Sequence, residues 1–153
     1  MAEDHIWTKR FVDLCAHIAS WSEDHDRHVG CVIVGPDGHE LRATGYNGLP
    51  RGVSDHDQRR FERASGEKFF WGEHAERNAI YNAARVGVPL QGCILYVNRF
   101  PCADCARAII QCGIVRVVCP LIPENDGALD YSFQVARQMM EEAGVRLELS
   151  ALE

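Results

Sequence analysis

The sequence predicts a layered α/β domain, and two observations carry that prediction. Segments with strand-type and helix-type patterning alternate through the second half of the chain, an order that places helices against the faces of a sheet. A length of 153 residues, with 46% hydrophobic and 25% charged side chains, suits one globular domain with its own core. We expect residues 1–153 to form that single domain, with the element order αββ, a long loop and then αβαβαβ.

The first third of the chain predicts a helix followed by a β-hairpin. In residues 5–20 one apolar stripe recurs at helical spacing, made by Trp7, Phe11, Leu14, Cys15 and Ile18. Residues 29–34 are mostly apolar and β-branched, which indicates a buried strand. The turn sequence at 35–38, Gly-Pro-Asp-Gly, leads into a second strand at residues 39–46.

The middle of the chain predicts a long loop. Residues 47–72 lack regular patterning, apart from a short helix expected near residues 57–63. A loop of this length in a compact domain is usually functional or mobile. Its basic residues are largely balanced by acidic neighbours, so a solvated charged loop is the default expectation.

The second half alternates helices with strands. Helix-type patterning, with a glycine near each C-terminal end, covers three segments: 73–86, 103–111 and 131–143. Short apolar segments between and after these helices predict three strands: 93–97, 114–119 and 145–149.

Composition excludes several classes of partner. The formal net charge is −6, whereas a protein that grips polynucleotide phosphates usually presents a basic surface. No apolar run approaches the roughly 20 residues that span a bilayer, and the first residues are acidic rather than those of a signal-peptide core. We therefore expect a cytoplasmic protein with neither a nucleic-acid nor a membrane partner.

Two motifs supply candidate metal ligands. His74 and Glu76 form an H-x-E motif, and Cys102 and Cys105 form a P-C-x-x-C motif with Pro101. Both cysteines lie at the start of a predicted helix, where free N–H groups and the helix dipole favour thiolates. One histidine and two cysteines leave the fourth tetrahedral position of a zinc ion open, as in catalytic sites. We expect one Zn²⁺ per chain, bound by His74, Cys102 and Cys105.

Glu76 is the candidate catalytic residue. Zinc lowers the pKa of water toward ~7, so that hydroxide forms at neutral pH. The two motifs together resemble the signature of zinc-dependent nucleobase deaminases, which implies that this hydroxide attacks a ring carbon bearing an exocyclic amine. Glu76 would accept the proton of the water, pass it to the ring nitrogen, and later protonate the departing ammonia. General acid–base assistance of this kind is typically worth ~10²–10⁴-fold in rate. The resemblance of the motifs to this signature thus implies a hydrolase that cleaves the C–N bond of a cyclic amidine.

Each motif alone is compatible with another role. A C-x-x-C motif by itself is typical of redox or structural zinc sites, and H-x-E occurs often by chance. Their conjunction, with each motif at a predicted helix start, favours a catalytic zinc site. The remaining cysteines lie mostly in apolar segments and are interpreted as buried free thiols: Cys15, Cys31, Cys93, Cys112 and Cys119.

Four stretches resemble deoxycytidylate (dCMP) deaminases, within the zinc-dependent cytidine and deoxycytidylate deaminase superfamily: residues 29–34, 44–52, 74–80 and 95–111. The zinc motifs are similar to those of the whole superfamily, whereas the G-Y-N-G-x-P-x-G loop resembles dCMP deaminases in particular. The resemblance implies a three-layer cytidine-deaminase-like fold, in which helices flank a mixed five-stranded sheet. It also implies hydrolytic conversion of dCMP to dUMP with ammonia release, and assembly as a homo-oligomer.

The resemblance also implies roles for residues around the pocket. Asn47 would contact the base or sugar, and the backbone N–H of Ala75 would meet the base carbonyl. Asn47-Gly48 is also a common turn dipeptide, so a purely structural role for Asn47 stays open. Among the basic residues of the long loop, Arg51 is the candidate for binding a substrate phosphate.

The chain departs from the dCMP deaminase pattern at three places. Glu23 stands where the family tends to have a basic residue, and Asn98-Arg99 replaces the residues expected before Phe-Pro-Cys. The loop at residues 120–130 is longer than is usual there. Each departure lies where a phosphate, a sugar or a ring substituent could be sensed. The alternative substrates are therefore other small amino-ring compounds: a cytosine nucleoside, a guanine-like purine or an amino-triazine.

Two further classes compete with this interpretation. The tRNA adenosine deaminases share the zinc motifs but resemble each other in a methionine between the two cysteines, where this chain has Ala103-Asp104. A zinc-stabilised binding module would need no glutamate beside the histidine. Both classes fit the sequence less well than a deaminase of a small aminopyrimidine.

Overall fold

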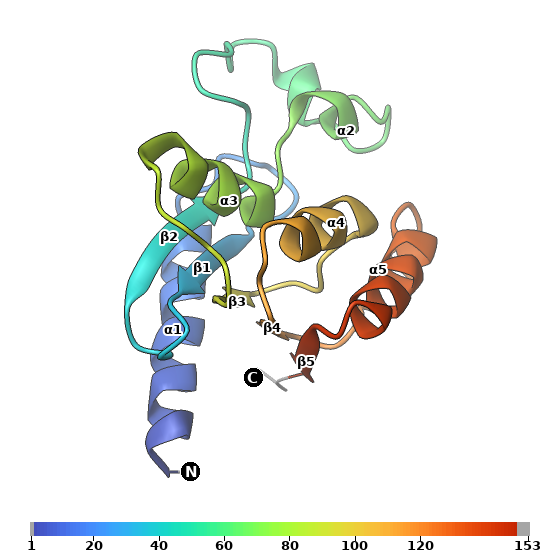
Figure 1. The fold of residues 1–153 in the computed structure, drawn as a ribbon. Coiled ribbons are helices and arrows are strands. Elements are labelled where there is room, and N and C mark those ends of the chain that lie inside the picture. Colours follow the sequence, from blue (N-terminus) through green and yellow to red (C-terminus); the bar gives the residue numbers. More distant parts are fainter. Residues whose placement is uncertain (1, 150–153) are drawn as a thin grey trace.

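A computed structural model of the chain describes residues 2–149. Its centre is a five-stranded sheet with the strand order β2-β1-β3-β4-β5 (Figure 1). The strands are β1 (Gly30–Val34), β2 (Leu41–Tyr46), β3 (Ile94–Val97), β4 (Arg116–Cys119) and β5 (Arg146–Leu149). β1 pairs antiparallel with both β2 and β3, whereas β3, β4 and β5 run parallel. The expected mixed five-stranded sheet is confirmed.

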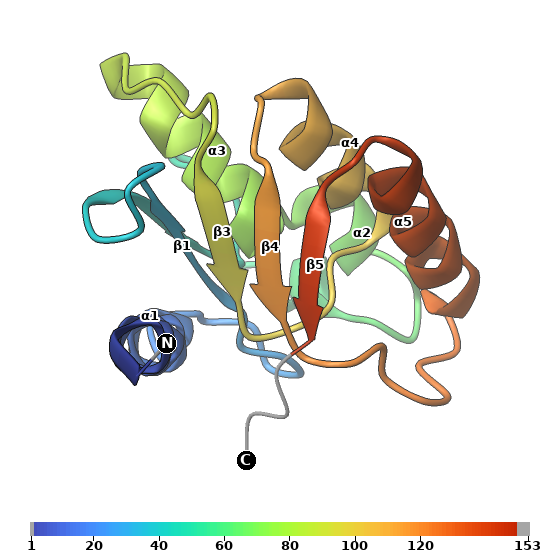
Figure 2. The same ribbon diagram turned by 60° about the horizontal axis from the view of Figure 1, so that its bottom comes forward.

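Helices cover both faces of this sheet. The long helices are α1 (Ala2–Ala19), α3 (Ala75–Val86), α4 (Ala103–Gln111) and α5 (Asp130–Glu142). Figure 2 shows α1 on one face of the sheet and α3, α4 and α5 on the other. α4 and α5 provide the crossovers that parallel neighbours require, while a tight turn is enough for the antiparallel β1–β2 hairpin.

Alternation along β1 divides the core into two layers. Val32 and Val34 pack with apolar residues of α1, whereas Cys31 and Ile33 belong to the larger cluster formed with α3, α4 and α5. All four side chains are fully buried. A strand covered on both faces has no solvent-facing side, which explains its continuous apolar sequence.

The middle segment is more ordered than its sequence suggests. A 3₁₀ turn, η1 (Gln58–Phe61), lies within the short helix expected near residues 57–63. A second short helix, α2 (Lys68–Trp71), was not predicted, because four residues are too few to establish a periodic pattern. Helix α3 begins two residues later than expected, since Glu73 forms an isolated β-bridge with Gly48. Within residues 2–149, no helix combines the length and apolarity needed to cross a bilayer.

Close approach of α3 to the hairpin depends on Gly45 of β2. A Cβ atom at this position would lie 2.3 Å from the backbone N of Ala79 and 2.4 Å from the backbone O of Ala75. Backbone atoms of a helix cannot move aside to make room, whereas the end of a flexible side chain can. The missing side chain therefore lets the first turns of α3 pack directly on the sheet.

Gly45→Ala should displace α3 and lower the free energy of unfolding by ~1–3 kcal/mol, the usual cost of overpacking. Chemical denaturation measures the change. Gly48→Ala is the matched control, because a Cβ atom there meets no atom within 4 Å. Equal stability of the Gly45→Ala variant and the control would contradict the packing argument.

Candidate metal centre and active site

Three of the predicted site residues come together at one point. The Nδ1 atom of His74 lies 3.4 Å from the Sγ atom of Cys102 and 3.4 Å from the Sγ atom of Cys105. One ligand atom from each of the three residues lies within 4.8 Å of the other two. Both cysteines are buried and the histidine is partly buried, so the group lies below the protein surface. The structure confirms that these residues are arranged to bind a metal ion.

Two helix N-termini bring the three residues together. His74 is the N-cap residue of α3 and Cys102 is the N-cap residue of α4, both with extended backbone conformations. Neither side chain makes a capping hydrogen bond to its own helix. Cys105 lies in the first turn of α4. The N-terminal ends of both helices therefore point their free N–H groups and positive dipole ends toward thiolate ligands.

The distances fit a zinc ion. Zinc bonds of about 2.0–2.1 Å to nitrogen and 2.3 Å to sulfur, at tetrahedral angles, place those two atoms ~3.5 Å apart. The observed 3.4 Å separations match this geometry without rearrangement. A set of one imidazole and two thiolates is also typical of zinc, and it leaves one coordination position for water or substrate.

The surroundings favour a thiolate at Cys102. A hydrogen bond from Cys105 is the largest influence and, with His74, it lowers the pKa of Cys102 to about 4 although burial opposes ionisation. Thiolates rather than thiols bind zinc. One of the two sulfur ligands is thus prepared for a metal ion by the fold itself.

Glu73 fixes the start of α3. Its carboxylate accepts hydrogen bonds from the backbone N–H of His74, at 3.0 Å, and from Nε of Arg77, at 2.5 Å. Its backbone pairs with Gly48 in both directions. Arg77 also lies 3.5 Å from Asp104 of α4. These contacts connect the two helix N-termini and the loop that carries Asn47.

Glu76 lies in the first turn of α3 and is 4% exposed. It lines the same cavity as His74 and Cys102 but does not belong to the three-residue metal group. Burial is the main cause that raises the pKa of its carboxyl group above the usual value. A carboxyl group with a raised pKa can both accept and return a proton near neutral pH.

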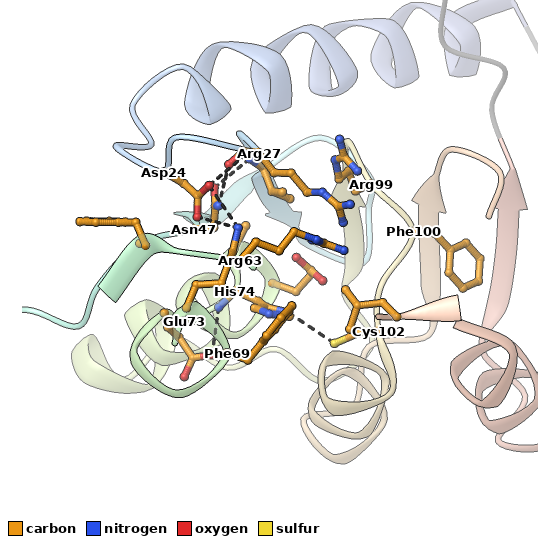
Figure 3. A pocket seen from close by; sticks show the side chains of 18 of the residues that line it. Asp24, Arg27, Asn47, Arg63, Phe69, Glu73, His74, Arg99, Phe100 and Cys102 are labelled. Atoms are coloured by element: carbon orange, nitrogen blue, oxygen red, sulfur yellow. Dashed lines mark hydrogen bonds and ion pairs between the residues drawn. The ribbon is translucent and has the colours of Figure 1, made fainter. Parts of the chain in front are cut away.

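The cavity above these residues has an apolar wall and a charged rim (Figure 3). The apolar lining consists of Val29, Phe61, Phe69, Phe100, Leu129 and Phe133. Such a wall suits a planar ring, while the few polar groups at its end determine orientation. Ala75 also lines the cavity, and as the first residue of α3 its N–H has no partner within the helix.

Asn47 lines the cavity, but its side chain is engaged by the protein. Its Oδ1 atom accepts a hydrogen bond from the N–H of Val29, and its Nδ2 atom donates to the carbonyl of Arg27, both at 2.8 Å. The amide therefore fixes the segment before β1 against the cavity. A contact to substrate would have to share these donor and acceptor atoms.

The structure does not bring Arg51 into the cavity. This exposed arginine donates a hydrogen bond to Oδ1 of Asn82 on α3, at 2.5 Å, and it is absent from the lining. The basic residues of the lining are instead Arg27, Arg60, Arg63, Lys68 and Arg99. The sequence offered one signal for this set, namely the Asn98-Arg99 departure from the family pattern.

The fold and site have counterparts among known proteins. A family model described as the cytidine and deoxycytidylate deaminase zinc-binding region matches residues 5–121. The chain belongs to this family. The resemblance inferred from the motifs is thereby confirmed, as is the zinc-binding character of the His74, Cys102 and Cys105 site.

Individual relatives differ in how much they share with this chain. An uncharacterized deaminase from Aliivibrio fischeri is 38% identical over 145 residues, which cover 92% of this chain and 91% of that protein. Human deoxycytidylate deaminase is 37% identical over 120 residues, and the match spans 76% of this chain but only 66% of the human protein. A cyanophage S-TIM5 dCMP deaminase, solved with dCMP and dUMP, superposes with a TM-score of 0.73 at 20% identity and covers 94% and 96% of the two chains. The last similarity concerns the fold.

Purified protein should contain about one zinc ion per chain, and Cys102→Ala should lose most of it, because a ligand at the junction of the two helices is missing. Elemental analysis after dialysis measures the ratio. Cys112→Ala is the matched control, since this partly buried thiol lies outside the metal group. Full zinc retention by Cys102→Ala would contradict the assignment.

Proposed function

We propose that the protein is a zinc-dependent hydrolytic deaminase that converts dCMP to dUMP and releases ammonia. The observation that carries the proposal is the buried Glu76 carboxyl group beside an open His74, Cys102 and Cys105 metal site, at the end of a cavity with an apolar wall. Family membership supports the deamination chemistry. The deoxycytidylate deaminases among the relatives support dCMP as the substrate.

Glu76 is the proposed catalytic residue. When bound, zinc supplies the Lewis acidity that makes hydrolysis by water feasible near neutral pH. Glu76 accepts the proton of the attacking water and delivers it to the ring nitrogen next to the reacting carbon. It then accepts the proton of the newly added hydroxyl group and gives it to the exocyclic amine, which leaves as ammonia while the carbonyl group of the product forms. The raised pKa of Glu76 suits a group that must change protonation state twice in one cycle.

Two backbone regions would orient the pyrimidine. The N–H of Ala75, free at the start of α3, donates to the carbonyl oxygen of the base. Asn47 holds the segment around Arg27 and Val29 at the cavity wall through its hydrogen bonds. Part of its effect on substrate binding therefore comes from keeping that segment in place. The apolar wall excludes water from the ring.

The experiment that tests the function measures ammonia release from a panel of amino-ring compounds: dCMP, CMP, deoxycytidine, cytosine, guanine and an amino-triazine. We expect turnover of dCMP with the highest kcat/KM. Preference for guanine or the amino-triazine, with dCMP inert, would replace the proposed substrate while retaining the reaction class.

Glu76→Gln tests the mechanism in the same assay. The variant should keep its zinc and fold, because the amide occupies the same volume, and lose ~10²–10⁴-fold or more in kcat. Glu142→Gln on the exposed face of α5 is the matched control. Unchanged ammonia release by Glu76→Gln would exclude its role as the proton carrier.

We also propose that the chain acts as a homo-oligomer in the cytoplasm. Several large side chains of the described region are solvent-exposed in the single chain, among them Trp21, Phe70, Tyr81 and Tyr131. All seven cysteines are free, which suits a reducing compartment. Light scattering should give a mass of at least two chains, each of 17.2 kDa. A monomer at the assay concentration would contradict the proposed assembly.

A further inference from the structure

Three arginines from three separate loops meet in the cavity. Arg27 precedes β1, Arg63 lies between η1 and α2, and Arg99 lies between β3 and α4. All three line the cavity of the metal centre. Figure 3 shows their side chains ending near one another, above His74 and Cys102 in that view. Gathering like charges is unfavourable unless other groups compensate them.

The carboxylate of Asp126 compensates the positive charges of two of these three arginines. Its side chain is 1% exposed and comes from the loop between β4 and α5. The carboxylate forms an ion pair with Nη1 of Arg27 and another with Nη2 of Arg63, at 2.8 Å. Burial opposes ionisation of Asp126, but the bonds from Arg27 and from the N–H of Leu129 outweigh it and lower its pKa. Asp126 therefore fixes the positions of both guanidinium groups.

The other basic residues of the lining are also engaged. Lys68 pairs with the buried Asp24 at 3.0 Å. Arg60 lies 4.0 Å from the ring centre of Trp71 and donates a hydrogen bond to the carbonyl of Ser54. These contacts leave both groups little freedom to bind a ligand.

Arg99 differs from all of these. Within residues 2–149 it has no carboxylate within 4.0 Å and no hydrogen bond to another residue, although it lies in the electrostatic field of Arg27 and Arg63. Desolvation is the main cause that lowers its pKa, and Arg27 acts in the same direction, whereas Asp126 and Asp26 act in the opposite direction from beyond contact distance. The guanidinium group therefore has no direct carboxylate partner in the described part of the chain. An anionic ligand would provide the missing compensation.

We propose that Arg99 is a substrate-binding residue for the 5′-phosphate of the nucleotide, with Arg27 and Arg63 as its neighbours in the same site, and that Asp126 is the positioning residue for that pair. This inference rests on the proposed function. Guanidinium groups bind phosphate oxygens through two parallel hydrogen bonds, and three of them converge here. A nucleoside, which lacks the phosphate, leaves Arg99 uncompensated, so the site also selects nucleotides over nucleosides.

The test compares kcat and KM for dCMP and for deoxycytidine in the zinc-loaded protein and its variants. Arg99→Ala should raise the KM for dCMP ~10- to 100-fold, the loss expected for charge-assisted hydrogen bonds, and change the KM for deoxycytidine much less, because that substrate has no phosphate. Arg99→Lys should recover part of the loss. Arg59→Ala is the matched control, because this arginine is exposed, pairs with Asp57 and lies outside the cavity.

Asp126→Asn separates positioning from folding. The amide can still accept the hydrogen bond from Leu129 but no longer neutralises Arg27 and Arg63. We expect a raised KM for dCMP with its kcat and the zinc content retained, and these retained values show that the variant is folded. A loss of kcat or of zinc with an unchanged KM would indicate a purely structural role and overturn the positioning assignment.

The remaining outcomes distinguish this inference from the proposed function. If the wild-type protein deaminates dCMP and Arg99→Ala keeps its KM, the phosphate assignment is wrong while the proposed function stands. If dCMP is inert from the start, both are wrong. Inorganic phosphate should raise the KM for dCMP in the wild type and have little effect in Arg99→Ala. If the arginine variants keep their KM for dCMP and differ from the wild type only in how added nucleoside triphosphates change their activity, the arginines belong to an effector site. That result would overturn the proposal.

Discussion

The structure depends on the convergence of two helix N-termini at one metal site. α3 follows α2 whereas α4 follows β3, yet the Nδ1 atom of His74 and the Sγ atom of Cys102, their N-cap residues, lie 3.4 Å apart. Gly45 permits the close packing of α3 on the sheet, and the N–H of Ala103 is capped by the Ser132 hydroxyl of α5. The sheet, the helices and the loop bridge at Glu73 all act to hold this junction. The geometry of the metal site is thus a consequence of how the core is packed.

Different parts of the cavity serve different steps. Under the proposed function, the junction of α3 and α4 provides the groups for the chemical step, because it carries the metal ligands and Glu76. The loops at the rim contribute the charged groups that would distinguish one amine from another. Asp126 connects two of those loops by pairing with Arg27 and Arg63. Substrate preference can therefore change through loop residues while the chemical step is retained.

Much of the fold and the metal site could be predicted from sequence, and the reasons are local. The helix at residues 103–111 was predicted with its observed bounds, since Pro101 and Gly113 mark both ends. The metal ligands were recognisable because their spacing reflects helix starts. The basic cluster was not predicted, because Arg27, Arg63 and Arg99 are distant in sequence and meet only through the tertiary fold. Arg51 looked equivalent to them in sequence but lies outside the cavity, bonded to Asn82.

Zinc at this junction has three protein ligands and one open position. X-ray absorption at the zinc edge tests this coordination most directly in the purified protein. We expect two sulfur atoms at ~2.3 Å, one imidazole nitrogen at ~2.0–2.1 Å and one further light atom from solvent. Four protein ligands, or a third sulfur, would describe a closed structural site and contradict the account.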